Sequence, residues 1–157
     1  MIPRIRSRFG VIAAALMLEA CDPGYYRAPV DWPQPNPGVW VRHFDGFTIR
    51  VPHLSGLVGD WWLSPTFEIR DNDLPVALVS ATLFTPSGTY PGTINHLYGT
   101  VPKGGGYLLP SWWFDREHRL PEVIGDRSYI VLEFLVGPRS VSVRVDYDRS
   151  SARWGWA

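Results

Sequence analysis

The alternation of apolar and polar side chains near the C-terminus is the feature that most constrains the fold of this chain. Residues 129–136 are almost wholly apolar, and in residues 141–147 valine or tyrosine alternates with serine, arginine and aspartate. Successive side chains of a β-strand point to opposite faces, so this alternation predicts a strand with one buried and one solvated face. Residues 137–140, Gly-Pro-Arg-Ser, are typical of a turn. The two segments are therefore predicted to pair as an antiparallel hairpin.

A second hairpin is predicted around Asp45-Gly46, a dipeptide typical of the two-residue type I′ turn. The turn joins residues 39–44 to residues 47–51. A two-residue loop fixes which residues face each other, and it predicts the pairs Phe44 with Phe47, Arg42 with Ile49, and Trp40 with Val51. One face of the hairpin is then apolar apart from Arg42, while the other face is mixed enough to meet water.

Further strand patterns follow between these two hairpins. Residues 61–70 alternate between apolar and polar side chains, and Pro65 predicts an edge position or a bulge because proline cannot donate to the ladder. Residues 76–85 predict a strand buried on much of both faces, with Pro86-Ser87-Gly88 as the turn after it. One face of that strand is expected to hold Ala77, Val79, Ala81 and Leu83.

Weaker strands are predicted around residues 94–98 and 107–114, followed by a turn-rich region at residues 115–127. No segment after residue 21 has a helical period. Seven or so short strands separated by glycine and proline predict an all-β fold, an antiparallel β-sandwich that is immunoglobulin-like in the loose architectural sense. A small β-barrel is the alternative.

The N-terminus has the layout of a secretory signal peptide. Arg4, Arg6 and Arg8 precede a run of ten residues without charge, residues 9–18. Spanning a bilayer takes roughly 20 apolar residues, so this run is too short for a transmembrane helix. Residues 1–20 are therefore predicted to be removed on export.

The sequence Leu18-Glu19-Ala20-Cys21 resembles the lipobox of bacterial lipoproteins. The resemblance implies that Cys21 carries acyl chains such as palmitate and becomes the first residue of the mature protein, anchored in the cell envelope and facing the periplasm. Cys21 is the single cysteine and can form no internal disulfide. Asp22 resembles the signal that retains some enterobacterial lipoproteins in the inner membrane, with the outer membrane as the alternative.

Residues 21–38 are predicted to be the lipidated N-terminus and a proline-rich tether, and residues 39–157 the folded domain. Five prolines lie between residues 22 and 38. In the polyproline II conformation, at about 3.1 Å per residue, this stretch would reach on the order of 50 Å. The alternative is an irregular arm that packs on the domain through Tyr25, Tyr26 and Trp32.

Few residue patterns point to chemistry. The chain has 15 basic and 15 acidic residues, and a net charge near zero argues against a nucleic-acid partner. The histidines lack the paired spacing of a zinc site; they are His43, His53, His96 and His118. Asp71-Asn72-Asp73 begins like a calcium loop but lacks the required glycine and distal glutamate, so it predicts a turn. No metal or cofactor is expected.

The amino-acid sequence also lacks recognisable catalytic motifs. Ser87 follows Pro86 and does not lie in a Gly-x-Ser-x-Gly elbow. Gly104-Gly105-Gly106 is preceded rather than followed by Lys103, so a flexible loop is expected in place of a phosphate cradle. The chain is therefore predicted not to be an enzyme.

Tryptophan is the enrichment that could carry binding, with eight residues in the chain. In a strand, neighbouring side chains point to opposite faces, so Trp61-Trp62 and Trp112-Trp113 must each send one indole outward if the other enters the core. Exposed indoles can stack on sugar rings or anchor a protein partner. The candidate contact residues are Trp62, Trp112, Trp113, Trp154 and Trp156. Alternatively, these rings cover sandwich edges.

Three function hypotheses follow. The favoured one is a membrane-anchored accessory or structural lipoprotein that contacts another envelope protein through an edge strand or its outward aromatic rings. The second is a binding module for a polysaccharide or peptidoglycan, with exposed indoles in a shallow groove near a carboxylate or amide such as Asp115 or Asn95. The third and weakest is an envelope hydrolase, which needs carboxylates or a histidine and hydroxyl converging in a pocket.

Overall fold

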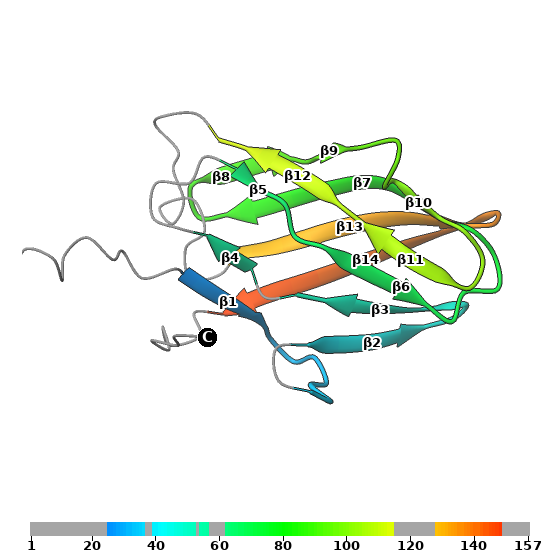
Figure 1. The fold of residues 1–157 in the computed structure, drawn as a ribbon. Helices are drawn as coiled ribbons and strands as arrows, with labels where there is room; N and C mark the ends of the chain where they lie inside the picture. The colour runs from blue at the N-terminus through cyan, green and yellow to red at the C-terminus, as the bar shows by residue number, and fades with distance from the viewer. Residues whose placement is uncertain (1–24, 37–38, 53, 57–61, 115–127, 149–157) are drawn as a thin grey trace, which may run out of the picture.

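The computed structural model describes residues 25–36, 39–52, 54–56, 62–114 and 128–148 of the chain. These residues form strands and turns, and no helix occurs among them. Accordingly, the described part of the chain contains no helix of the length and apolar character needed to cross a bilayer. The strands stack as open antiparallel sheets in layers (Figure 1), which confirms the predicted β-sandwich and not the closed alternative.

The larger sheet is seven-stranded and carries the chain's longest strands. Its order is β10-β7-β13-β14-β1-β4, and β8 pairs with the same edge of β7 as β10 does. Its strands are β1 (Tyr25–Pro29), β4 (Leu54–Gly56), β7 (Val76–Thr85), β8 (Gly88–Pro91), β10 (Thr100–Val101), β13 (Ser128–Val136) and β14 (Arg139–Asp148). The predicted C-terminal hairpin is β13 and β14, with Val136 facing Arg139 across Gly137-Pro138.

Two smaller sheets make up the second layer, in front of β7, β13 and β14 in Figure 1. The four-stranded sheet has the order β11-β6-β3-β2, with β2 (Trp40–Phe44), β3 (Phe47–Val51), β6 (Phe67–Arg70) and β11 (Gly105–Leu108). The three-stranded sheet has the order β5-β12-β9, with β5 (Trp62–Leu63), β9 (Thr93–Ile94) and β12 (Pro110–Trp113). The hairpin predicted at Asp45-Gly46 has the expected register throughout.

Two chain segments, residues 62–70 and 105–113, run antiparallel through both smaller sheets and form one ribbon whose ladder is interrupted in the middle. β5 pairs with β12 and β6 pairs with β11 in the same register, so Pro65 and Pro110 fall at facing positions between the two ladders. Proline has no N–H to donate, and two prolines at one level end the ladder there. The prediction of a single strand over residues 61–70 is therefore wrong at Ser64, Pro65 and Thr66, which lie in no strand. The part of the segment that forms β6 lies in the interior of its sheet, between β11 and β3.

The hydrophobic core fills the space between the layers. The ring of Phe47 on β3 lies 5.5 Å from that of Phe134 on β13, which joins the two layers directly. The apolar face predicted for the first hairpin is buried, with Phe47, Ile49 and Val51 at most 2 % exposed. Other fully buried side chains come from both layers, among them Phe67, Ile69, Leu83, Leu108, Ile130 and Leu132.

A bulge in β7 changes the predicted assignment of its faces. Along β13, Glu133 faces Ser80 but the next residue, Phe134, faces Leu78, which leaves Val79 as an extra residue on β7. One unpaired residue reverses the alternation, because side chains repeat with a period of two. Val76 and Leu78 are therefore buried before the bulge and Ala81 and Leu83 after it, while Val79 is 56 % exposed. Ala77 and Val79 were therefore wrongly assigned to the face of Ala81 and Leu83.

The N-terminal arm belongs to the domain. β1 pairs with β14 on one side and with β4 on the other, so it is an interior strand of the larger sheet. Trp32 follows it and is 7 % exposed, with the guanidinium carbon of Arg42 4.8 Å from its ring centroid. The packed-arm alternative therefore holds for the backbone of β1 and for Trp32, and the sheet already includes β1 ahead of the domain start predicted at residue 39.

The turns at the far end of the sandwich tie the layers together. Gly46 has a φ of 92°, as the predicted turn requires. Arg139, which begins β14, forms an ion pair with Asp45 in that turn.

Asn72 is buried and donates to the carbonyls of Leu74 and Pro102, so residues 71–73 form the predicted turn. Gly105 and Gly106 lie in β11, which corrects the flexible loop expected for the triple glycine.

Candidate functional site

Two exposed tryptophans face each other across the β5–β12 ladder. Trp62 and Trp113 are directly opposite in register, and their ring centroids lie 6.2 Å apart at an interplanar angle of 27°. Trp62 is 49 % exposed and Trp113 is 58 % exposed. Because each indole covers part of the other, the pair holds its orientation at the surface without entering the core.

A groove of about 300 Å³ runs beside this pair. Its described walls come from β5 and β12, from the segment around Asn95, and from the break between the ladders; they are Trp62, Ser64, Asn95, Tyr98, Leu109, Ser111 and Trp113. None of these side chains carries a charge. The groove therefore combines an aromatic wall with hydroxyl and amide groups and suits an uncharged surface of a ligand.

Several polar groups of the groove are open to a ligand. The Asn95 side-chain carbonyl accepts a hydrogen bond from the Leu97 N–H at 2.9 Å, which fixes the side chain and leaves its amide nitrogen without a partner in the described part of the chain. Ser64 donates to the Pro110 carbonyl at 3.3 Å, which spans the proline break. Among the described hydrogen bonds, none uses the Ser111 hydroxyl or the Tyr98 hydroxyl.

Trp112 lies in the core and not at the surface. Its side chain is fully buried, and its indole N–H donates to the Tyr90 carbonyl at 3.0 Å. The alternation in β12 sends Trp113 outward and Trp112 inward, so the assignment of Trp112 as a contact residue is wrong. Trp154, Trp156, Trp61 and Asp115 lie outside the described residues, so their predicted contacts stay predictions.

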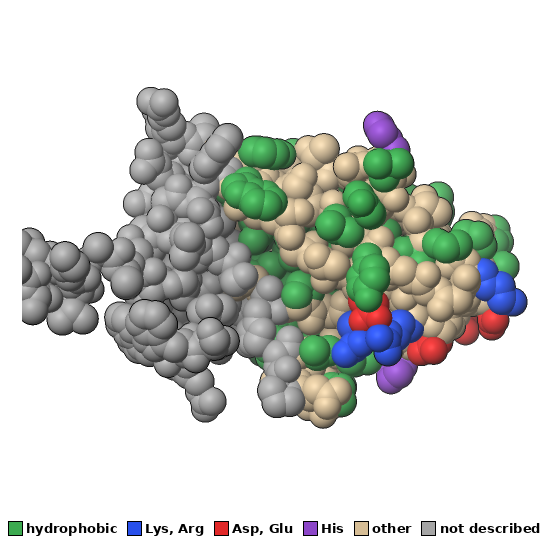
Figure 2. Space-filling view, viewed as in Figure 1, with side chains coloured by type: hydrophobic (Ala, Val, Ile, Leu, Met, Phe, Trp, Pro, Cys, Tyr) green, Lys and Arg blue, Asp and Glu red, His purple; other side chains and the backbone are tan. Residues whose placement is uncertain are grey.

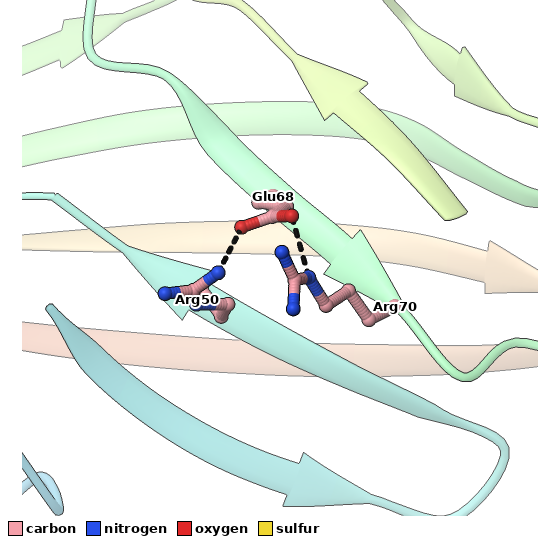
Figure 3. A network of polar contacts seen from close by, with 3 residues as sticks. All are labelled: Arg50, Glu68 and Arg70. Carbon is pink, nitrogen blue, oxygen red and sulfur yellow. Dashed lines mark hydrogen bonds and ion pairs between the residues drawn. The ribbon is translucent and has the colours of Figure 1, made fainter. Parts of the chain in front are cut away.

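A charged cluster lies further along the same ribbon. Glu68 on β6 accepts from Arg50 Nη1 at 2.7 Å through one oxygen and from Arg70 Nε at 2.5 Å through the other, as Figure 3 shows. The Arg70 side chain is 52 % exposed, while those of Arg50 and Glu68 are 23 % and 18 % exposed. In Figure 2 this cluster gathers over β6 and β3, on the same face as exposed hydrophobic side chains over β5 and β12.

The remaining candidates do not converge. His43 lies 2.9 Å from the Thr48 hydroxyl through Nδ1, and His96 is exposed; His53, His118 and Cys21 lie outside the described residues. Within the described ranges, no three side chains of histidine, cysteine, aspartate or glutamate lie together as a metal site. The Ser87 hydroxyl lies 2.9 Å from the Thr85 hydroxyl in the turn before β8.

Sequence reasoning named Trp62, Trp113 and Asn95 but missed the rest of the site. The two serines come together because β5 pairs with β12, a contact between segments about 50 residues apart. Tyr98 lies beside Leu109, whose N–H donates to the Tyr98 carbonyl at 3.4 Å. The facing prolines Pro65 and Pro110 carried a usable signal, since counting residues away from them in opposite directions aligns Trp62 with Trp113. A comparison with protein-family models finds no match to this chain, and a comparison with curated proteins finds none either.

Proposed function

We propose that this chain is a lipid-anchored envelope protein whose sandwich binds a polysaccharide in the groove beside Trp62 and Trp113. The observation that carries the proposal is an exposed, oriented indole surface in one groove with amide and hydroxyl groups that no described residue binds. Sugar rings present both kinds of surface to a protein, because their C–H groups form an apolar face and their hydroxyls lie around the rim.

The groove and a sugar ring present complementary surfaces to each other. A pyranose face laid on an indole removes apolar surface from water on both partners, at about 25 cal/mol per Å² buried. The Asn95 amide nitrogen and the Ser111 and Tyr98 hydroxyls then exchange water for sugar hydroxyls, which adds orientation more than affinity. Because the stacked tryptophans are already held against each other, little side-chain entropy is lost on binding.

The anchor would restrict where this polysaccharide lies. Only Asp22, Pro23 and Gly24 separate Cys21 from the start of β1. Four residue steps span at most about 14 Å. If Cys21 is acylated as the lipobox resemblance implies, the sandwich stays close to the bilayer surface, and the polysaccharide bound there is an envelope polymer.

Retention of the full-length chain on immobilised polysaccharides tests the proposal. The panel includes peptidoglycan sacculi and neutral and anionic glycans, and the test variant is Trp62→Ala with Trp113→Ala. We expect the wild type to be retained on at least one polymer and the variant to lose that retention. Leu135→Ala is the matched control, because it removes an exposed apolar side chain from the larger sheet. Failure of the wild type to bind any polymer of the panel would overturn the proposal.

A protein partner is the second candidate, and one observation favours it. Leu97, which is 81 % exposed, lies next in the chain to the groove residue Tyr98, which is 46 % exposed, and adds apolar surface outside the groove. Exposed apolar patches on soluble domains commonly mark protein contacts. Crosslinking in the native envelope, through a photoreactive residue at position 97, distinguishes a protein partner from a polysaccharide. Recovery of a defined protein that is lost with Trp62→Ala favours the protein partner. Recovery of glycan alone favours the polysaccharide.

A further inference from the structure

We infer that the polysaccharide bound by this protein is an extended, negatively charged polymer, held by its sugar faces at Trp62 and Trp113 and by its anionic groups at Arg50 and Arg70. This inference rests on the proposed polysaccharide function and adds the chemical class of the polymer. It follows from what the two halves of the interrupted ribbon present to solvent.

One side of the ribbon presents a continuous series of outward residues. Successive outward positions lie two residues apart, and the common register of the two ladders aligns them in facing pairs. From the aromatic end to the charged end the pairs are Trp62 with Trp113, Ser64 with Ser111, Thr66 with Leu109, Glu68 with Tyr107, and Arg70 with Gly105. The ladder is broken between Leu63 and Phe67, but the sequence of facing residues is unbroken.

The charged end has one more positive than negative group. Glu68 uses both oxygens, one for Arg50 and one for Arg70, so a single carboxylate serves two guanidinium groups. Arg50 gives one nitrogen to this contact and Arg70 gives Nε, and the other N–H donors of both have no partner in the described part of the chain. Guanidinium groups with spare donors favour carboxylates, sulfates and phosphates, which they bind in a forked geometry.

Asp71 follows Arg70 directly and is exposed, but it forms no ion pair with Arg50 or Arg70 among the described residues. Thr48 and His43 lie beside Arg70 along its row of the sheet, and Val41 lies beside Arg50. The ion pair of Lys103 and Asp73 lies at the turn before β11 and is neutral as a pair. Tyr107 faces Glu68 and is 57 % exposed, which offers a second aromatic surface next to the cations.

The length of the series identifies a polymer and not a small sugar. Eight residue steps separate Trp62 from Arg70, which corresponds to roughly 26 Å along a strand. A ligand that touches both ends must be extended over that distance. Between the tryptophan pair and the charged cluster, the outward residues Ser64, Thr66, Leu109 and Ser111 carry no charge, so no charged side chain repels an anionic chain before it reaches the cluster.

The test compares two polymers that share one backbone, neutral hydroxyethylcellulose and anionic carboxymethylcellulose, by affinity gel electrophoresis of the full-length chain. We expect tighter binding to the anionic polymer, and we expect the preference to fall as salt rises. Arg50→Gln with Arg70→Gln should weaken binding to carboxymethylcellulose about tenfold and leave the neutral polymer unaffected. Arg144→Gln with Arg139→Gln is the matched control, because it removes the same charge from β14.

Glu68→Gln gives a result that loss of folding cannot imitate. It removes the only carboxylate of the cluster and should strengthen binding to carboxymethylcellulose by several-fold. Equal binding of both polymers by the wild type, or no gain with Glu68→Gln, would overturn the anionic ligand while the groove proposal stands. Binding of either polymer that survives Trp62→Ala with Trp113→Ala would instead count against the groove.

Discussion

Tyr147 on β14 holds a buried hydroxyl that has no hydrogen-bond partner among the residues that the structure describes, and its removal is expected to stabilise the domain. The side chain is 2 % exposed, in an interior strand where Tyr147 faces Ser128 on β13 and Pro29 on β1. A buried polar group without a partner costs roughly 1–3 kcal/mol. Phenylalanine at this position removes that cost and keeps the ring.

The net gain can be worked out from two opposing terms. Loss of the hydroxyl leaves a void of about 10 Å³, close to the space of one water-sized probe. At about 24 cal/mol per Å³ the void costs roughly 0.2 kcal/mol, so Tyr147→Phe should raise the free energy of unfolding by about 1–3 kcal/mol. For a domain of this size the melting temperature should rise by roughly 4–11 °C.

The pH dependence provides a second readout of the same substitution. Burial raises the pKa of Tyr147 above its ordinary value. The unfolded chain therefore releases the phenolic proton first, near pH 10, and above that pH the folded state holds more protons than the unfolded state. Wild-type stability should then fall by about 1.4 kcal/mol per pH unit relative to Tyr147→Phe, while below pH 9 the difference between the two proteins is constant.

Urea denaturation followed by tryptophan fluorescence measures both effects, with Tyr107→Phe as the exposed control that should change stability little. Destabilisation by Tyr147→Phe of 1 kcal/mol or more would refute the reasoning, because it would mean that an internal water or another group satisfies the hydroxyl. A stability difference that stays constant above pH 10 would refute the assigned burial.

Three other predictions concern the core, the first hairpin and the anchor. Trp112→Ala should destabilise the domain by about 3–5 kcal/mol and Trp113→Ala by less than about 1 kcal/mol, and equal losses in urea denaturation would contradict the opposite orientations of the two side chains. Gly46→Ala should cost about 1–2 kcal/mol because the φ of 92° disfavours any residue with a Cβ, whereas Ser140→Ala, at an exposed position, serves as the neutral control. Protein isolated from its own cells should begin at Cys21 with a mass increase for acyl chains, and Cys21→Ser should be free of them; an unmodified chain that begins at Met1 would contradict the lipoprotein proposal.

Local patterns predicted the hairpins because a hairpin is specified by residues close together in the chain. Asp45-Gly46 determines the turn geometry and, with it, every pair in the β2–β3 ladder. The same holds for β13 and β14, where alternation alone assigns the buried face. The outward position of Trp62 followed from the same rule and is confirmed.

Features that depend on distant partners were not predictable in this way. The bulge at Val79 arises from the pairing of β7 with β13, which are separated by about 50 residues. The packing of β1 between β14 and β4 depends on strands far along the chain, and the prolines around it suggested an extended arm instead. The groove and the charged cluster likewise need the register of β5–β6 against β11–β12, to which only the facing prolines point.

The interior position of β1 has a mechanical consequence. A pull on the chain ahead of Tyr25 is directed along a strand that is hydrogen-bonded to β14 on one side and β4 on the other. Tension along such a strand loads its hydrogen bonds in shear, so several must break together, whereas a strand peeled from a sheet edge loses them one at a time. A domain tethered through this end would resist unfolding when a bound ligand is pulled away from the attachment. Single-molecule force spectroscopy should find a higher rupture force for a pull from the N-terminal side than for a pull from an attachment at β2.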